Sequence, residues 1–413
     1  MIFLAIAATT VLETACGESG GDNTPSMPDK PSTPDEPEQP GTGNQWNPGH
    51  WSGNWMQWSF AKGADVSYVT QMEDEGYKFH HIDGTDDDLM NILKLDCGVN
   101  AIRLRVWVDP KPMNPATGKI YNNLADVLAK AERAAALNLQ IMIDFHFSDY
   151  WADPGKQWIP DAWKNYSKEQ LMQAMTAHIN EVLNALKAKN ISPRWVQLGN
   201  EVTWGMMWDP AYSPDNQNKS DISGQPADGD DYSQQRDRNF ADYIQTAYNA
   251  VKAIDPTICT IVHITNAYES YWDGYGAWIF NILRFYNVDY DMIGLSLYPT
   301  QAAGYKAADL LTKYVNPAID NAKKLSADYG RPIMFAEVGM PWDDPTGAAN
   351  MIQTIMNAAK SDSNLRGIFY WEPEANPYWE AEGNGSHGYT LGGFDPNTNS
   401  PTQALSPFLN NID

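Results

Sequence analysis

The chain contains few cysteines and few basic residues for its length. Only three of its 413 residues are cysteine, too few to build a disulfide framework. Its 28 lysines and arginines are outnumbered by 52 aspartates and glutamates, which gives a formal net charge of −24. Nucleic acids and anionic lipid surfaces attract basic proteins, so this balance excludes binding to either through surface charge. The apolar run near the N-terminus, "IFLAIAATTVL", is too short to span a membrane.

That short run and the residues after it predict a processed N-terminus rather than part of the fold. The run is followed by "ETAC", which resembles a bacterial lipoprotein signal over residues 1–16, with lipid carried by Cys16. Residues 17–45 are mostly Gly, Pro, Ser and acidic, and we expect a disordered tether there. The combination predicts an outer-membrane lipoprotein exposed at the cell surface, in contact with the membrane only through its lipid. The alternative is an ordinary secretory signal and a secreted or periplasmic protein.

From residue 46 to 413 the pattern predicts one α/β domain, a (β/α)₈ TIM barrel. Eight short apolar or alternating segments read as strands: "WSFAKGAD", "NAIRLRVWV", "QIMIDFHFS", "RWVQLGNE", "TICTIVHIT", "DMIGLSLYP", "PIMFAEVG" and "GIFYWEP". Amphipathic stretches follow them, at about 85–96, 123–138, 167–189, 236–254, 275–286, 307–326, 346–360 and 402–412. An open doubly wound sheet would carry a Gly-rich phosphate loop after its first strand, and "AKGADVSY" is not one. We expect Cys97 and Cys259 to be buried, unpaired thiols.

Polar or aromatic residues occupy the ends of seven consecutive predicted strands. Barrel enzymes place their chemistry at the carboxyl ends of their strands, so these residues are the candidate site. The candidates are Arg103, Asp144, His146, Asn200, Glu201, His263, Tyr298, Glu337, Trp342 and Trp371. A lone histidine such as His146 is more often structural than functional.

Two of these candidates, Glu201 and Glu337, are the carboxyl pair that glycosidic bond cleavage needs. One carboxyl protonates the leaving oxygen, and the other attacks or activates water. Arg103 and Arg105 share one face of their strand, and we expect both to hold the ionised carboxylate of this pair, the one that attacks, and keep it acidic.

The motifs "IRLRVWVDP", "DFHFSDYWADPGKQ", "VQLGNE", "EVG" and "YWEP" resemble glycoside hydrolase family 53, the endo-β-1,4-galactanases, within a clan of retaining (β/α)₈ glycosidases. The resemblance runs from about Trp58 to the C-terminus. It implies that Glu201 is the acid/base and Glu337 the nucleophile. It also implies that Asn200 binds the sugar 2-hydroxyl, that Trp371 stacks under that ring, and that Tyr298 hydrogen-bonds the nucleophile.

The function implied is endo-acting, retaining cleavage of β-1,4-galactosidic bonds in galactan or type I arabinogalactan. We expect a monomer whose partner is this polysaccharide. Some bacterial relatives hold calcium near the last two strands. Here the segment after Glu337 lacks spaced ligands, and Asp343 and Asp344 suit a helix start, so we expect no metal and no other cofactor. Two alternatives stay open: an endo-glycanase of the same clan acting on xylan, mannan or glucan, and a non-catalytic surface glycan-binding lipoprotein.

Overall fold

The structure is a closed eight-stranded parallel barrel, as the sequence predicts. This computed structural model describes residues 58–113, 117–208, 232–265, 267–268, 276–379 and 388–412. The barrel strands follow one another in the order β1-β4-β5-β6-β7-β8-β9-β10, and β10 pairs with β1 to close the ring. Their bounds are β1 Ala61–Asp65, β4 Ala101–Val106, β5 Gln140–Phe145, β6 Trp195–Leu198, β7 Cys259–Ile264, β8 Met292–Leu297, β9 Ile333–Val338 and β10 Leu365–Trp371.

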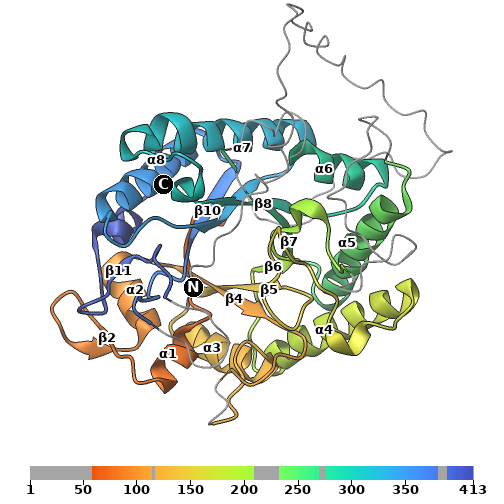
Figure 1. Ribbon diagram of the computed structural model, residues 1–413, viewed down its shortest axis with the longest axis horizontal. Helices are drawn as coiled ribbons and strands as arrows, with labels where there is room; N and C mark the ends of the chain where they lie inside the picture. Colours follow the sequence, from red (N-terminus) through yellow and green to blue (C-terminus); the bar gives the residue numbers. More distant parts are fainter. Residues whose placement is uncertain are drawn as a thin grey trace, which may run out of the picture.

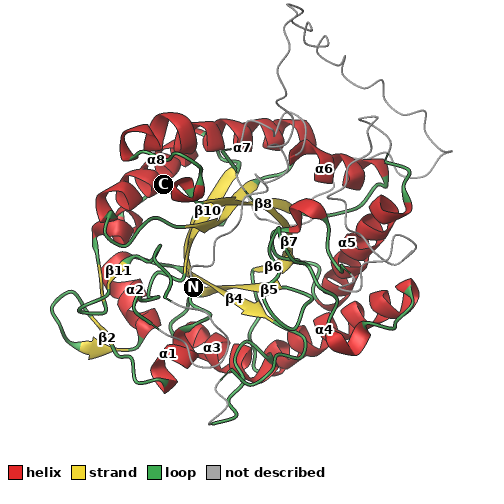
Figure 2. Cartoon of the chain, viewed as in Figure 1, coloured by secondary structure: helices red, strands yellow, loops and turns green. Residues whose placement is uncertain are grey.

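Helices surround this ring of strands, as Figures 1 and 2 show. They are α1 Val69–Asp74, α2 Leu89–Cys97, α3 Leu124–Ala136, α4 Lys168–Ala188, α5 Gln235–Ile254, α6 Gly276–Phe285, α7 Asn316–Tyr329 and α8 Pro345–Ser361. Most of the buried apolar side chains lie between this helical layer and the outer face of the barrel.

Successive side chains of each strand point alternately to the helices outside the barrel and to the barrel interior. In β4, Ile102, Leu104 and Val106 join the core beneath the helices, whereas Arg103 and Arg105 lie on the opposite face. The floor of the interior is a second apolar cluster, made of Ala61, Ala101, Met142, Trp195, Cys259, Ile261, Met292, Met334, Ala336 and Phe369. Most of these residues lie in the first half of their strands, so the barrel is filled at its amino end. The polar residues of the same strands therefore collect above this floor, toward the carboxyl ends.

The first helical stretch differs from its prediction. The expected helix at about 85–96 begins at Leu89, because the Asp88 carboxylate accepts a hydrogen bond from the Met90 amide and caps it. Residues before it form a small antiparallel hairpin of β2 (Phe79–His80) and β3 (Asp86–Asp87), which the sequence analysis missed together with helix α1.

Two other helical stretches also depart from expectation. The stretch predicted at 307–326 starts with a 3-10 turn, Ala307–Asp309, and a π-helix, Leu310–Val315, before α7. Pro317 has no amide proton to donate to the preceding turn, and it stands in the first turn of α7, where that loss costs least. The predicted tail helix is a 3-10 helix, Gln403–Leu409, with Pro407 inside it.

The two cysteines of the described residues are buried and unpaired, as predicted: Cys97 ends α2 and Cys259 begins β7. No helix in this described part is long and apolar enough to cross a membrane. Cys16, the signal at 1–16 and the tether at 17–45 lie outside the described residues, so the boundaries expected there stay predictions.

Candidate active site

Glu201 and Glu337 lie at the carboxyl end of the barrel, after β6 and in β9, with β7 and β8 between their strands. Glu337 belongs to β9 and pairs in register with Ser296 of β8, while the Ser296 hydroxyl donates to Glu201 Oε1 at 2.6 Å. One serine therefore lies next to both carboxylates. Glu201 follows β6 in the left-handed region (φ 47°, ψ 50°), which a non-glycine residue adopts only where its surroundings hold it there.

Arg103 of β4 links Glu337 to two further carboxylates. Its guanidinium contacts Asp65 Oδ2 at 2.7 Å, Asp144 Oδ2 at 2.9 Å and Glu337 Oε1 at 2.9 Å. It also donates to Asn200 Oδ1 at 2.8 Å. This single cation connects β1, β4, β5 and β9 with the segment after β6, and it fixes one oxygen of Glu337.

Arg105 does not hold the nucleophile candidate, contrary to the expectation that both arginines do so. Its Nη1 pairs with Glu372, just beyond β10, and its guanidinium faces the rings of Tyr68 and Trp151 at 4.5 and 4.2 Å. Glu372 also accepts from the Tyr68 amide at 3.1 Å. The Arg105–Glu372 pair is fully buried, so it fastens β4 to the loop after β10 instead of serving Glu337.

The pKa values of the two glutamates are both raised, with Glu201 the higher. Burial and the nearby charge of Glu337 raise the pKa of Glu201 to about 8. Burial raises the pKa of Glu337 to about 7, although Arg103 and a hydrogen bond from Tyr298 both lower it. We expected Glu337 to be kept acidic by arginine. Arg103 does lower the pKa of Glu337, as expected, but burial raises it by more, so the net change is upward. The order still makes Glu201 the group that keeps its proton longer.

Tyr298, just past β8, donates its hydroxyl to Glu337 Oε2 at 2.7 Å, which confirms the hydrogen bond that the resemblance implied. Gly339, two residues after Glu337, makes this approach possible. A Cβ on Gly339 would lie 2.8 Å from Tyr298 Cε1 and 2.7 Å from Tyr389 Oη. Arg103 and Tyr298 thus hold one oxygen each of Glu337.

Four residues expected to bind substrate, Arg103, Asp144, His146 and His263, are all at most 3% exposed, and their substrate contacts stay predictions. His146 uses both ring nitrogens within the protein, Nε2 toward Asp144 at 3.0 Å and Nδ1 as acceptor from the Ala152 amide at 3.0 Å. Asp144 also accepts from Gln197 at 2.6 Å. These side chains contact one another in a polar layer beneath the two glutamates.

Asn200 stands at the edge of this layer. Its Oδ1 accepts from Arg103, and its Nδ2 donates to the Ala152 carbonyl at 2.8 Å, which leaves a second Nδ2 proton for another acceptor. A hydrogen bond from Asn200 to the sugar 2-hydroxyl therefore stays a prediction.

Aromatic rings line the mouth of the barrel beside the glutamates. Trp371, at the end of β10, is partly buried, with ring centroids 4.6 Å from Tyr389 and 5.6 Å from Trp151. Trp342, beyond β9, is also partly buried and lies 6.4 Å from Tyr378, which is 66% exposed. Such rings suit the apolar faces of sugars, and the stacking role expected of Trp371 stays a prediction.

The sequence analysis missed Ser296, Gln197 and Asp65, and it gave no role to Glu372. Ser296 stands two residues before Tyr298, so strand alternation alone places both on the inner face. Asp65 is the last residue of β1 and carries the same strand-end signal as the candidates that were chosen. Gln197 and Glu372 lie inside quoted motifs, but their partners come from distant strands.

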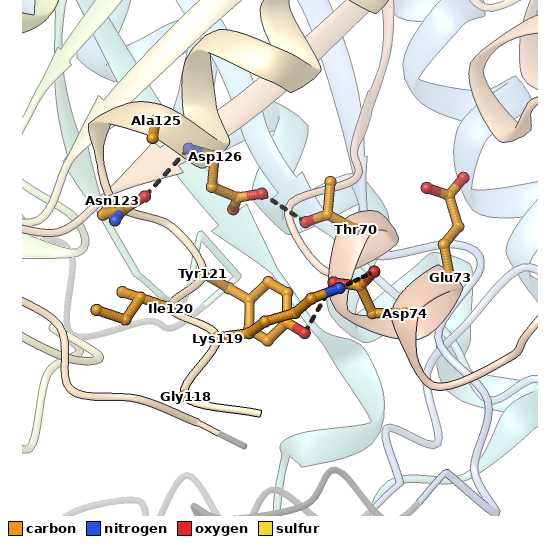
Figure 3. A pocket seen from close by; sticks show the side chains of 10 residues that line it. All are labelled: Thr70, Glu73, Asp74, Gly118, Lys119, Ile120, Tyr121, Asn123, Ala125 and Asp126. Atoms are coloured by element: carbon orange, nitrogen blue, oxygen red, sulfur yellow. Dashed lines mark hydrogen bonds and ion pairs between the residues drawn. The ribbon is translucent and has the colours of Figure 1, made fainter. Parts of the chain in front are cut away.

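A cavity of about 460 Å³ lies elsewhere, between α1 and residues 118–126 (Figure 3). Its polar groups already have partners: Lys119 pairs with Asp74, Tyr121 donates to Asp74 at 3.0 Å, and Thr70 donates to Asp126 at 2.7 Å. None of the candidate residues lines it, so we place the chemistry at the glutamate pair.

Among the described residues no group of three or more His, Cys, Asp or Glu could hold a metal ion. Asp344 caps α8, where its carboxylate accepts from the Gly347 amide at 2.9 Å. This is the helix-start role expected for the acids after Glu337, and the expectation of no cofactor stays a prediction.

Comparison with known proteins gives a consistent result. A family model described as glycosyl hydrolase family 53 matches residues 61–408, and so includes all eight barrel strands. An uncharacterized protein of Niallia circulans is 34% identical over 296 residues, 70% of each chain. An arabinogalactan endo-β-1,4-galactanase of Thermothelomyces thermophilus is 29% identical over 329 residues, 76% of this chain and 89% of that one. A solved fungal β-1,4-galactanase aligns with a TM-score of 0.67 at 26% identity, covering 85% of this chain and 99% of its own.

Proposed function

The chain belongs to glycosyl hydrolase family 53, and we propose that it cleaves β-1,4-galactosidic bonds within galactan or type I arabinogalactan, as an endo-acting, retaining enzyme. Relatives named as arabinogalactan endo-β-1,4-galactanases, one of them 29% identical, support this substrate. Such an activity serves the breakdown of pectin side chains.

The observation that carries the proposal is the glutamate pair at the carboxyl end of the barrel. Glu337 is held by Arg103 on one oxygen and by Tyr298 on the other, with its carboxylate fixed for attack on the anomeric carbon. Glu201 has the higher pKa, about 8, so it holds a proton at neutral pH for the leaving oxygen.

Each residue changes its role between the two steps of a double displacement: Glu201 from acid to base, and Glu337 from nucleophile to leaving group. Glu337 forms a covalent bond to the sugar as Glu201 gives its proton to the leaving group. Glu201, now ionised, removes a proton from water, and the water oxygen displaces Glu337. Retaining enzymes keep their carboxyl groups about 5–5.5 Å apart, and we expect this separation between Glu201 and Glu337 in a substrate-analogue complex.

Asn200, Trp371 and Trp342 complete the proposal as substrate contacts. Asn200 offers its remaining Nδ2 proton to the 2-hydroxyl at the cleavage site, and Trp371 lies under the same ring. Trp342, beside the exposed Tyr378, suits a neighbouring sugar.

The test is hydrolysis of linear β-1,4-galactan beside xylan, mannan and cellulose, followed by reducing-sugar release and by proton NMR of the first products. We expect galactan to be preferred, oligosaccharides to appear before galactose, and the β-anomer to form first. Preference for another polymer would support the related endo-glycanase, no hydrolysis would support a glycan-binding protein, and an α-anomer would refute retention.

Variants of the pair assign the two roles. Glu337→Ala should abolish turnover on every substrate. Glu201→Ala should lose less on aryl galactosides with good leaving groups, which need little protonation, and azide should restore part of its activity. Equal losses at both positions on polymer and aryl substrate would contradict the assignment.

We further propose that lipid on Cys16 attaches the enzyme to the outer membrane at the cell surface, with residues 17–45 as a tether. The support is the apolar run, the "ETAC" motif and the Pro- and Gly-rich composition that follows. Washed intact cells should hydrolyse galactan, and external protease should remove that activity. Cys16→Ala should release or mislocalise the protein without changing the purified enzyme, which we expect to be a cofactor-independent monomer. Activity found only in lysates would refute surface exposure.

A further inference from the structure

Glu201 is enclosed by a ring of hydrogen bonds that begins at its own amide and ends at its own carboxylate. The Glu201 amide donates to His263 Nδ1 at 3.3 Å, His263 Nε2 lies 2.8 Å from Ser296 Oγ, and that hydroxyl donates to Glu201 Oε1 at 2.6 Å. His263 comes from β7 and Ser296 from β8, and both are 0% exposed. Glu201 itself keeps 9% of its surface exposed.

The direction of each hydrogen bond in this ring depends on which nitrogen of His263 carries the proton. Nδ1 lies near an acceptor, Asn200 Oδ1 at 3.1 Å, and near a donor, the Glu201 amide. Asn200 Oδ1 already accepts from Arg103 at 2.8 Å and from Gln197 at 3.1 Å. The Glu201 amide has no other acceptor among the described residues, and a buried amide without one is costly. The amide therefore decides the tautomer: Nδ1 accepts, and Nε2 carries the proton.

The rest of the ring follows from this tautomer. Burial and the charge of Arg103 lower the pKa of His263 well below its ordinary value, so its imidazole is neutral and has one N–H. That N–H donates from Nε2 to Ser296 Oγ. A serine hydroxyl has a single proton, and the Ser296 proton is then directed to Glu201 Oε1. Oε1 is held as an acceptor in both ionisation states of Glu201.

We propose that His263 and Ser296 are positioning residues that hold Oε1 of Glu201 as an acceptor, so that its acidic proton resides on Oε2. The Thr265 side chain also hydrogen-bonds the Glu201 carboxyl group, and it belongs to the same surroundings. This inference rests on the proposed acid/base role of Glu201. The proton leaves Oε2 for the glycosidic oxygen in the first step, and a proton from water returns to Oε2 in the second, so none passes through the ring. The same ring holds Glu201 in its left-handed backbone conformation.

Without the ring, the proton could reside on Oε1 and point into the barrel, where it cannot reach the substrate. Ser296→Ala removes one hydroxyl and interrupts the ring with little change in volume. Ser326→Ala is the matched control, because Ser326 is a buried serine on α7, outside the site. His263→Phe interrupts the ring at its other member. Melting temperatures of all variants report whether each one folds.

The first measurement needs no substrate. Selective ¹⁵N labelling of histidine in the full chain reports the tautomer of His263, and ¹³C labelling of glutamate carboxyls reports the titration of Glu201. We expect His263 to carry its proton on Nε2 in the wild type. Ser296 donates to the ionised form of Glu201, so Ser296→Ala should raise the pKa of Glu201 by about one unit. The other groups that act on Glu201 are the charges of Glu337 in β9 and Asp153 beyond β5 and the hydrogen bond from Thr265, and none of them is altered by this substitution.

The second measurement is the pH dependence of kcat/KM. Ser296→Ala and His263→Phe should each lower kcat/KM on galactan by about ten- to a hundredfold. The loss should be smaller on an aryl galactoside with a good leaving group. The alkaline limb of the profile should move to higher pH in Ser296→Ala, and the double variant should lose little more than the worse single one.

An Nδ1–H tautomer, or an unchanged Glu201 titration in Ser296→Ala, would overturn the inference. Equal losses on both substrates with unmoved pH limbs would show a structural role only. If His263→Phe does not fold, the Ser296→Ala results decide by themselves. If the wild-type chain cleaves no galactan while both NMR results hold, the proposed function fails and the hydrogen-bond ring stands.

Discussion

The hydroxyl of Tyr298 offers a quantitative test of how the proton is distributed between Glu201 and Glu337. It donates to Glu337 Oε2 at 2.7 Å, and Tyr298→Phe removes that donor while keeping the ring. A hydrogen bond to a charged group contributes about 1.5–3 kcal/mol, which corresponds to a pKa increase of about one to two units for Glu337. The sign is upward, because the lost bond stabilised the ionised carboxylate.

The consequence depends on the small gap between the two pKa values. Glu337 starts at about 7 and Glu201 at about 8, so an increase of this size places Glu337 level with Glu201 or above it. The singly protonated site would then carry its proton on the nucleophile at least half of the time, which is the inactive arrangement. We expect kcat/KM to fall by about two- to tenfold even at the optimum, and the acid limb to move to higher pH.

The assay is the pH profile of kcat/KM on galactan for the wild type, Tyr298→Phe and a control. Tyr243→Phe is a suitable control, because Tyr243 is a fully buried tyrosine on α5. A Tyr298→Phe enzyme with the kcat/KM of the wild type and an unmoved acid limb would refute the reasoning. It would mean that Arg103 alone sets the ionisation of Glu337.

Three further predictions follow from the same site. Trp371→Ala should lower kcat/KM on galactan at least about tenfold with a small change in melting temperature, and a large loss of stability with intact kinetics would make the tryptophan structural. Gly339→Ala should resemble Tyr298→Phe in its kinetics, because the new methyl group would displace the Tyr298 ring, and normal activity would contradict the close packing seen here. The pKa of Glu201 rises on folding, so the folded state binds more protons between about pH 4.5 and 8 and stability should fall as pH rises through that window. Melting temperatures at pH 5 and pH 8 should show this fall, and Glu201→Gln should reduce it; an equal fall in that variant would refute a contribution from Glu201.

Much of this site could be predicted because its signals are local. A strand that runs into a Gly-containing loop marks the barrel's carboxyl end, and this rule places Glu201 and Glu337 correctly. Period-two alternation places Arg103 and Arg105 on one inner face, as observed. Neither inference needs knowledge of which strands are neighbours.

The partners of the arginines could not be predicted in the same way. Arg105 pairs with Glu372, 267 residues away, only because β10 closes the barrel against β1. The depth of His146 and His263 in the barrel depends on how far each strand is shifted against the next, and the sequence pattern does not encode that shift. The helix expected from residue 85 begins later for a related reason. Asp86 and Asp87 suit a helix start, but here they pair with Phe79 and His80 in the hairpin of β2 and β3.

The layer beneath the two glutamates carries more negative than positive charge. One guanidinium, that of Arg103, faces Asp65, Asp144 and Glu337, while the cation of Arg105 is occupied by Glu372. The charges of Asp144 and Asp65 therefore add to burial in raising the pKa of Glu337. Glycoside cleavage passes through a transition state in which the sugar ring becomes cationic. A site with an excess of negative charge stabilises that cationic transition state more than it stabilises the neutral substrate. The same excess of charge that raises the pKa of Glu337 therefore lowers the barrier to cleavage.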